Sequence, residues 1–192
     1  MFRWSDAPAD RPYGGYPCAL NDGELWLTGL MGKKSAAPTP AIAALQAAGI
    51  EFATHEYAHD PRAESFGSEA TQALGHDPSR VFKTLVITDG HALAVAVVPT
   101  SGTLSLKAAG AALGLHRPTM ADPADVRRVT GYVLGGVSPF GQRKRLPTAV
   151  DESALTFETV FCSAGRRGLE VELAPSDLVA VASAVVAPLA AP

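Results

Sequence analysis

The sequence predicts an α+β fold, a single domain with a mixed, curved central β-sheet and flanking helices. Two apolar, β-rich runs, residues 81–87 and 92–98, are joined through Asp89-Gly90, a dipeptide typical of a type I′ hairpin turn. Both runs are apolar on both faces, so the hairpin is expected in the middle of a covered sheet. Strand-like and helix-like segments are mixed elsewhere without a regular βαβ order, which favours the α+β class.

Caps, prolines and glycines mark the expected helix ends. Thr39 can cap a helix that starts at Pro40 and stops at Gly49, and Asp122 can cap one that starts at Pro123 and ends near Gly131. The remaining elements are predicted from apolar periodicity and β-rich composition. The other expected helices are residues 65–74, 107–113 and 176–186, and the other expected strands are residues 52–57, 132–134, 148–150, 160–163 and 169–173.

A chain of 192 residues with 47% hydrophobic content is the size of one globular domain. Residues 1–38 are expected to be an irregular N-terminal extension, because they are rich in Pro, Gly and Trp without a helical or alternating period. Residues 39–192 are expected to form the working domain. No stretch approaches the ~20 apolar residues of a membrane helix, and the two cysteines are far apart in sequence. These features predict a soluble, cytoplasmic protein that does not bind a membrane.

The charge distribution bears on the kind of partner. A net charge of −3 argues against binding of long duplex DNA, which depends on release of counterions by basic proteins. Basic residues nevertheless gather at 127–128, 143–145 and 166–167, each beside a glycine-containing turn. The three clusters together favour a phosphate-bearing partner, and ordinary solvated loop cations are the alternative.

Two features stand out as candidates for chemistry. Lys83 interrupts an apolar strand and is expected on the same face as Val81, Leu85 and Ile87. A lysine there either reaches solvent at the strand end or lines a pocket, since burial without a partner is costly. The glycine-rich loop 135–141 follows a predicted strand, so its N–H groups could approach a carbonyl or phosphate, or it is an ordinary turn.

Three other segments contain residue types that can carry chemistry. Glu170 and Glu172 are expected on one face of a strand. Residues 55–59 spell His-Glu-x-x-His, but zinc binding by this motif needs a helix, and the aromatic, extended character of the segment and Asp60-Pro61 argue against one. No metal site is therefore predicted. Cys162 lies inside a predicted strand without a neighbouring base, which favours a buried, inert thiol.

Several separated blocks together resemble the YbaK branch of the YbaK and prolyl-tRNA-synthetase-associated domains. The resemblance covers about residues 39–188 in order, and agreement of separated blocks is more specific than one short motif. The blocks are Thr39-Pro40-Ala41, residues 57–61, residues 81–85, residues 131–142, Arg145-Leu146-Pro147-Thr148 and residues 163–172.

The resemblance implies a set of site residues and no cofactor. The family's lysine falls on Lys83, which is the expected catalytic residue. The expected substrate-binding residues are Tyr57, Gly135, Gly136, Val137, Ser138, Pro139, Ser163 and Glu170. Glu170 stands where the family's best-known member has aspartate, so its side chain is one carbon longer at this position.

The resemblance also implies a reaction. The chain would act in trans as a hydrolase on mischarged aminoacyl-tRNA, with Cys-tRNA(Pro) as the expected substrate and the cysteine thiol of the substrate as the nucleophile. The expected partners are the 3′ acceptor end of tRNA(Pro) and prolyl-tRNA synthetase. Two alternatives stay open: a water-using deacylase for alanine or another small residue, and a non-catalytic module that binds tRNA or a synthetase.

Overall fold

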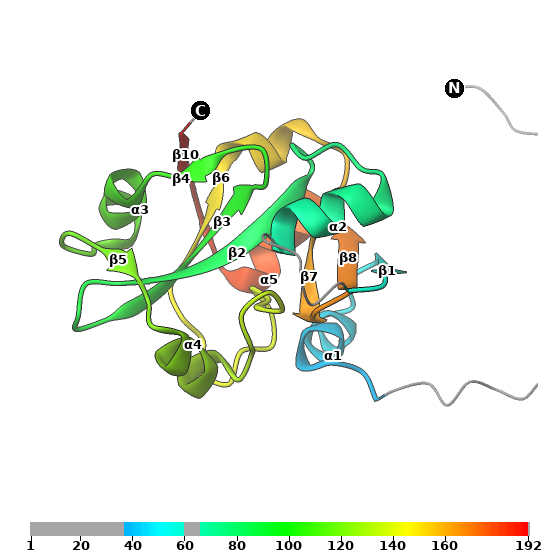
Figure 1. Ribbon diagram of the computed structural model, residues 1–192, viewed down its shortest axis with the longest axis horizontal. Coiled ribbons are helices and arrows are strands. Elements are labelled where there is room, and N and C mark those ends of the chain that lie inside the picture. Colours follow the sequence, from blue (N-terminus) through cyan, green and yellow to red (C-terminus); the bar gives the residue numbers. More distant parts are fainter. Residues whose placement is uncertain (1–36, 60–65, 192) are drawn as a thin grey trace, which may run out of the picture. The chain divides into compact units, whose positions relative to one another are not determined.

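The computed structural model describes residues 37–59 and 66–191 (Figure 1). The predicted extension over residues 1–38 lies almost entirely outside this described part, as do the predicted helix start at Ser65 and the last residue, Pro192. The helices are α1 (Pro40–Ala47), α2 (Phe66–Leu74), α3 (Leu106–Leu113), α4 (Pro123–Thr130) and α5 (Pro175–Ala182), with a 3₁₀ helix η1 (Glu152–Thr156). The strands are β1 (Phe52–Glu56), β2 (Val81–Thr88), β3 (Leu93–Pro99), β4 (Thr103–Leu104), β5 (Thr119–Met120), β6 (Thr148–Asp151), β7 (Val160–Arg166), β8 (Leu169–Leu173), β9 (Val185–Ala187) and β10 (Ala190–Ala191).

The main sheet has the strand order β1-β8-β7-β2-β3-β6-β9, and β5 adds to β2. The β2–β7, β3–β6 and β6–β9 pairs are parallel, and the β1–β8, β7–β8 and β2–β3 pairs are antiparallel. This arrangement confirms the predicted α+β class with a mixed sheet. It also confirms that the β2–β3 hairpin is central.

Helices cover both faces of the sheet (Figure 1). One face packs against α1, α4 and α5, through a core that includes Leu45, Val126 and Leu178. The opposite face packs against α3 and α2 in two smaller clusters, represented by Ala109 and Ala70. Alternation along the strands divides the residues between the faces, because successive side chains point to opposite sides.

The predicted helix caps are confirmed at two positions. The Thr39 Oγ1 accepts a hydrogen bond from the Ile42 N–H at the start of α1, and Pro40 is the first helical residue. The Asp122 carboxylate accepts one from the Ala124 N–H at the start of α4. These side chains satisfy donors that the first turn of a helix leaves without a partner.

The predicted type I′ turn between β2 and β3 is wrong. Four residues connect the strands, since Thr88 pairs with Leu93. A type I′ turn needs a positive φ at both central residues, but only Gly90 of this connection has one. The Asp89 carboxylate accepts hydrogen bonds from the N–H groups of His91 and Ala92, which stabilises the wider loop.

Two other predicted elements differ from the structure. Residues 132–134 form a loop and not a strand, because the Tyr132 side chain packs into the core while its hydroxyl donates to the Phe140 carbonyl. The closing helix ends at Ala182, not at residue 186, because Ser183 adopts a left-handed conformation with φ 47°. The chain then pairs with β6 as β9, and such tertiary pairing overrides a local helical pattern.

The sequence predicted that no segment is apolar enough over a sufficient length to form a membrane helix. In residues 37–59 and 66–191, no helix has the length and apolar character to cross a bilayer.

Candidate active site

Three of the predicted site residues lie side by side on the α2 side of the sheet. The parallel register pairs Phe82 of β2 with Cys162 of β7, so the next step along both strands places Lys83 beside Ser163. Ser163 is paired in turn with Glu170 of β8. Because residues at matching positions of adjacent strands share a face, the three side chains form a row across β2, β7 and β8. Ser163 and Glu170 are on paired strands, which are about 4.8 Å apart.

The pairing between β2 and β7 ends next to this row. Pairing of β2 with β7 stops at Phe82, and on the same edge β2 meets β5 only at Ile87 and Thr88. The other edge of β2 is fully paired with β3. Within the described residues the stretch 83–85 therefore has no strand partner on the side of β7, so the backbone next to Lys83 is not held by sheet hydrogen bonds on that side.

Lys83 is partly buried and has a single described acceptor. Its Nζ donates to the Gly102 carbonyl at 2.6 Å, and no carboxylate within the described residues forms an ion pair with it. Burial lowers the pKa of the Lys83 ammonium. An ammonium carries three N–H donors, so two remain for an anionic ligand.

Glu170 is the buried carboxyl of the row. Its exposed fraction is 6%, and its side chain forms no hydrogen bond with the part of the chain that the structure describes. Burial raises the pKa of Glu170 to about 8, since desolvation disfavours the charged form. A carboxyl that titrates near neutral pH can exchange a proton with a bound substrate.

Tyr57 lies just beyond β1 and next to this carboxyl. Its N–H donates to the Gly168 carbonyl at 3.0 Å, which continues the β1–β8 pairing by one residue. Burial, and then the nearby carboxyls of Glu170 and Glu69, raise the pKa of Tyr57 to about 12. The phenol therefore stays neutral and can donate a hydrogen bond near Glu170.

The loop 135–139 packs against the turn between β7 and β8. A Cβ on Gly136 would lie 3.0 Å from backbone atoms of Arg166 and Arg167, so only glycine allows this approach. The Arg167 side chain also donates from Nε to the Leu134 carbonyl at 2.9 Å. Within the described residues no hydrogen bond joins the loop directly to Lys83, Ser163 or Glu170, and its recorded contacts are with the β7–β8 turn that follows Ser163.

The donors of this loop differ from one another. The Gly136 N–H donates to the Val133 carbonyl at 3.0 Å, so it already has an acceptor within the loop. The Val137 and Ser138 residues are buried, yet their N–H groups have no acceptor among residues 37–59 and 66–191. Buried N–H groups are almost always paired. The N–H groups of Val137 and Ser138 are thus left for a ligand. The Ser138 Oγ accepts a hydrogen bond from the Phe140 N–H, and Pro139 is buried.

The His-Glu-x-x-His segment is extended, as predicted, because residues 52–56 form β1. Its side chains have separate partners. The His55 Nε2 lies 3.0 Å from a Glu172 carboxylate oxygen, and the His59 Nδ1 lies 2.9 Å from one of Glu69. Two histidines that pair with different carboxylates do not converge on a metal, and the prediction of no metal site stays a prediction.

Cys162 belongs to the opposite face of β7. It is fully buried in the core with α1, and desolvation raises the pKa of its thiol. A neutral thiol on the far side of the sheet cannot reach a substrate at the row. The interpretation of Cys162 as a core residue is confirmed.

We therefore expect Cys162→Ser to keep at least about half of the wild-type kcat, with a loss of stability of roughly 1 to 3 kcal/mol from the buried hydroxyl. Deacylation kinetics and urea unfolding would measure the two effects. A kcat near zero in a variant that remains folded would contradict the core assignment.

The sequence did not reveal a cluster of rings on the same face. The His76 ring stacks on Phe161 with centroids 4.0 Å apart, and the Arg80 guanidinium lies 5.2 Å from the Phe161 centroid. Arg80 also approaches Glu172 at 3.5 Å. Because His76 and Arg80 come from the connection between α2 and β2, no sequence period places them next to β7.

Comparisons with known proteins agree with the geometry. Residues 60–181 match the family of aminoacyl-tRNA editing domains. The relative EbsC of Enterococcus faecalis, named as a candidate Cys-tRNA(Pro)/Cys-tRNA(Cys) deacylase, is 33% identical over 150 residues, which are 78% of this chain and 91% of EbsC.

Solved structures agree as well. The crystal structure of a candidate trans-editing enzyme for prolyl-tRNA synthetase is 28% identical with a TM-score of 0.69, and the match covers 80% of this chain and 96% of that one. The hypothetical protein APE2540 is 25% identical with a TM-score of 0.70, over 79% of this chain and 99% of that one. The resemblance inferred from the sequence blocks is thereby confirmed. The chain belongs to the aminoacyl-tRNA editing domain family.

Proposed function

We propose that this chain is a cytoplasmic trans-editing deacylase that removes cysteine from tRNA(Pro) and works alongside prolyl-tRNA synthetase. Membership of the editing family makes it an aminoacyl-tRNA deacylase. The printed names of two related proteins, a Cys-tRNA(Pro)/Cys-tRNA(Cys) deacylase and a trans-editing enzyme for prolyl-tRNA synthetase, support the finer choice of substrate.

The observation that carries the proposal is the row of Lys83, Ser163 and Glu170 beside the end of the β2–β7 pairing. Lys83 has no described carboxylate partner, so its charge is available to the terminal phosphate of the tRNA or to charge that develops in the reaction. The N–H groups of Val137 and Ser138 are the available donors for the ester carbonyl. Ser163 and Tyr57 add a hydroxyl each for the amino acid.

Among the residues that the structure describes, the site has no recognisable protein nucleophile. Cys162 lies on the other face, and the Ser163 Oγ accepts a hydrogen bond from the Gly165 N–H at 3.4 Å without a histidine bonded to it among the described residues. Catalytic serines need an adjacent base. We therefore assign the nucleophile to the substrate, namely the thiol of the bound cysteine.

In the proposed step the sulfur of the substrate cysteine bonds to the carbonyl carbon of its own ester, the bond between that carbon and the ribose oxygen breaks, and the ribose oxygen takes a proton. The thiol proton passes to Glu170 or to solvent. The resulting ring contains sulfur, Cβ, Cα and the carbonyl carbon, so it is a strained four-membered thiolactone, and water later opens it.

Ring strain raises the importance of the charged groups. Proximity alone gains less for a strained ring than for a relaxed one. Stabilisation of the negative charge on the carbonyl oxygen by Lys83 and the loop donors must then supply much of the acceleration. A water molecule activated by Glu170 is the competing route, since the raised pKa of Glu170 also suits a general base.

Single-turnover rates on one tRNA(Pro) charged with cysteine, serine or alanine test the proposal. We expect cysteine to react roughly 100-fold or more faster than serine, because a thiolate forms near neutral pH and an alkoxide does not. Alanine has no nucleophile and should be nearly inert. Equal rates for cysteine and alanine would show that an enzyme-bound water acts, while detection of free thiolactone after the tRNA has been removed would support the thiol route.

A further inference from the structure

A pocket lined by four arginines includes Val133 and Leu134, which directly precede the loop 135–139. It has a volume of about 770 Å³. Three separate segments of the chain contribute to it. The arginines are Arg127 and Arg128 on α4, Arg143 in the loop after it, and Arg167 in the β7–β8 turn. These are the three basic clusters noted in the sequence, and the fold brings a member of each to one place.

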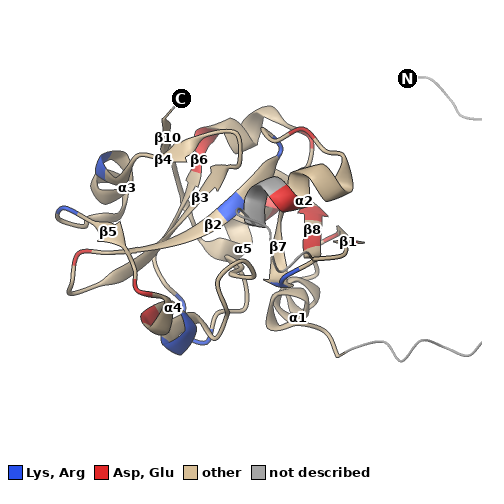
Figure 2. Cartoon of the chain, in the orientation of Figure 1, with Lys and Arg blue, Asp and Glu red and all other residues tan. Residues whose placement is uncertain are grey.

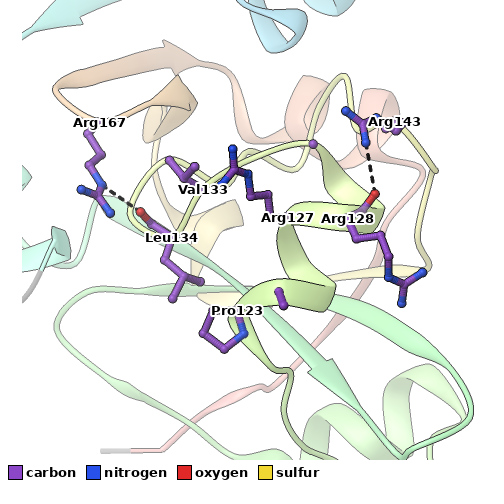
Figure 3. A pocket seen from close by; sticks show the side chains of 9 residues that line it. Pro123, Arg127, Arg128, Val133, Leu134, Arg143 and Arg167 are labelled. Atoms are coloured by element: carbon purple, nitrogen blue, oxygen red, sulfur yellow. Dashed lines mark hydrogen bonds between the residues drawn. The ribbon is translucent and has the colours of Figure 1, made fainter.

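The arginines are arranged around a partly apolar wall (Figure 3). Arg167 and Arg143 lie at opposite sides, and Arg127 lies between them, near Val133. Arg143 donates from Nη1 to the Arg128 carbonyl at 3.4 Å, and the hydrogen bond from Arg167 to Leu134 holds the other side. Backbone carbonyls thus orient two of the guanidinium groups.

The positive charge of the pocket is only partly balanced. Arg128 forms an exposed ion pair with Asp125 at 2.6 Å. The side chains of Arg127 and Arg143 have no carboxylate partner among the described residues, and no residue that lines the pocket is acidic. Figure 2 shows basic residues on α4 at this place. Guanidinium groups brought together without acids repel one another, so the arrangement favours an anionic ligand.

The pocket adjoins the candidate active site along the chain. Val133 and Leu134 form its wall, and the loop 135–139 follows them directly. On the other side, Arg167 precedes Gly168, whose carbonyl accepts the Tyr57 N–H. The arginine pocket is on α4, which covers the face of the sheet opposite to the row, so a nucleic acid that reaches both must cross the edge formed by these two segments. The proposal takes the 3′ end into the site and the paired acceptor stem across this edge to the arginines.

We infer that this pocket binds backbone phosphates of the tRNA acceptor stem, outside the site that holds the aminoacylated end. The inference rests on the proposed function, since it takes the tRNA 3′ end to occupy the row of Lys83, Ser163 and Glu170. Recognition is by charge and shape, because side chains cannot read bases in the deep groove of an RNA duplex. Arginine suits this task through its planar set of N–H donors.

Charge reversal at the two exposed, acid-free arginines tests the inference. Arg127→Glu and Arg143→Glu should each raise KM for aminoacyl-tRNA at least about tenfold, the loss expected for one charged contact, and leave kcat within about twofold. Each should also lower the salt dependence of tRNA binding by close to one unit in the slope of log Kd against log salt. Lys107→Glu is the matched control, because Lys107 is exposed on α3 and the charge change is identical.

A second substrate distinguishes binding of the tRNA acceptor stem from binding of the aminoacylated 3′ end. An aminoacylated CCA trinucleotide lacks the stem, so its KM should be unchanged by Arg127→Glu. An effect of Lys107→Glu as large as that of Arg127→Glu, or equal losses on the trinucleotide and on full tRNA, would overturn the inference. Binding of inorganic phosphate that is lost in Arg127→Glu while tRNA binding is unchanged would also overturn it, in favour of a small anion.

Failure of the proposed function would look different. If the wild-type protein deacylates none of the charged tRNAs, the editing proposal fails. Direct binding of uncharged tRNA, compared between wild type, Arg127→Glu and Lys107→Glu, would still decide the role of the pocket.

Discussion

Replacement of Lys83 by alanine is expected to lower the single-turnover rate of deacylation by roughly 10³-fold, close to the loss seen when one transition-state donor is removed. Lys83 is the only lysine or arginine in β2, and no described carboxylate neutralises it. Removing the Lys83 ammonium takes away the cation proposed to face the terminal phosphate of the tRNA or the oxygen of the ester carbonyl. The measurement is a rapid-quench time course on Cys-tRNA(Pro) with enzyme in excess.

The fold should survive this change. Lys83 is partly exposed, and the lost hydrogen bond to Gly102 costs on the order of 1 kcal/mol, a small part of domain stability. Lys83→Met keeps the apolar stem and removes the charge, so it should be equally inactive. Lys107→Ala on α3 is the control for loss of any lysine. Wild-type rates in Lys83→Met, with an unchanged urea midpoint, would remove Lys83 from the mechanism.

Replacement of Glu170 by glutamine should change how stability depends on pH. Burial raises the pKa of Glu170 to about 8 in the folded chain, from about 4.5 when unfolded. Between these values the folded state holds a proton that the unfolded state has released. Stability therefore falls as pH rises, by about 1.4 kcal/mol per pH unit from pH 5 to pH 8. Glutamine does not titrate, so the variant should lose this slope and be more stable than wild type at pH 8.

Urea unfolding at pH 5.5, 6.5 and 7.5 measures this effect. Glu172→Gln is the matched control on the same strand and face. Hydrogen bonds from Thr159 and His55 lower the pKa of Glu172, so its contribution is present above pH 4.5 and is lost only in more acidic solution. The titration of Glu172 itself therefore adds nothing to the slope between pH 5 and 8, and any change in this control reports the loss of its charge beside His55 and His76. Identical slopes in wild type and Glu170→Gln would contradict the raised pKa of Glu170.

Glu170→Gln also tests whether Glu170 takes part in proton transfer during deacylation. If Glu170 exchanges protons with the substrate, the wild-type rate should change between pH 7 and 9, and Glu170→Gln should flatten that limb of the profile. A profile that keeps its shape would assign the limb to the substrate thiol alone.

The sequence predicted the sheet strands and caps where local chemistry is decisive. Thr39 and Asp122 cap helices because a short side-chain oxygen next to proline favours that geometry in nearly any context. The covered β2–β3 hairpin followed from apolar residues on both faces. The prediction failed at residues 132–134 and 183–186, where distant contacts decide the conformation. Tyr132 hydrogen-bonds to Phe140, and Val185 and Val186 pair with β6.

The sequence by itself determined the family, the α+β class and the identity of the residues in the row, since strand alternation and the separated blocks are local properties of the chain. Only the tertiary structure decided what those residues face. Register between β2, β7 and β8 places Lys83, Ser163 and Glu170 together, and burial by elements distant in sequence gives Glu170 its pKa. The arginines at 127, 143 and 167 meet only because α4 and its following loop pack beside the β7–β8 turn. Spacing along the chain carries no information about such convergence, because packing between distant elements sets it.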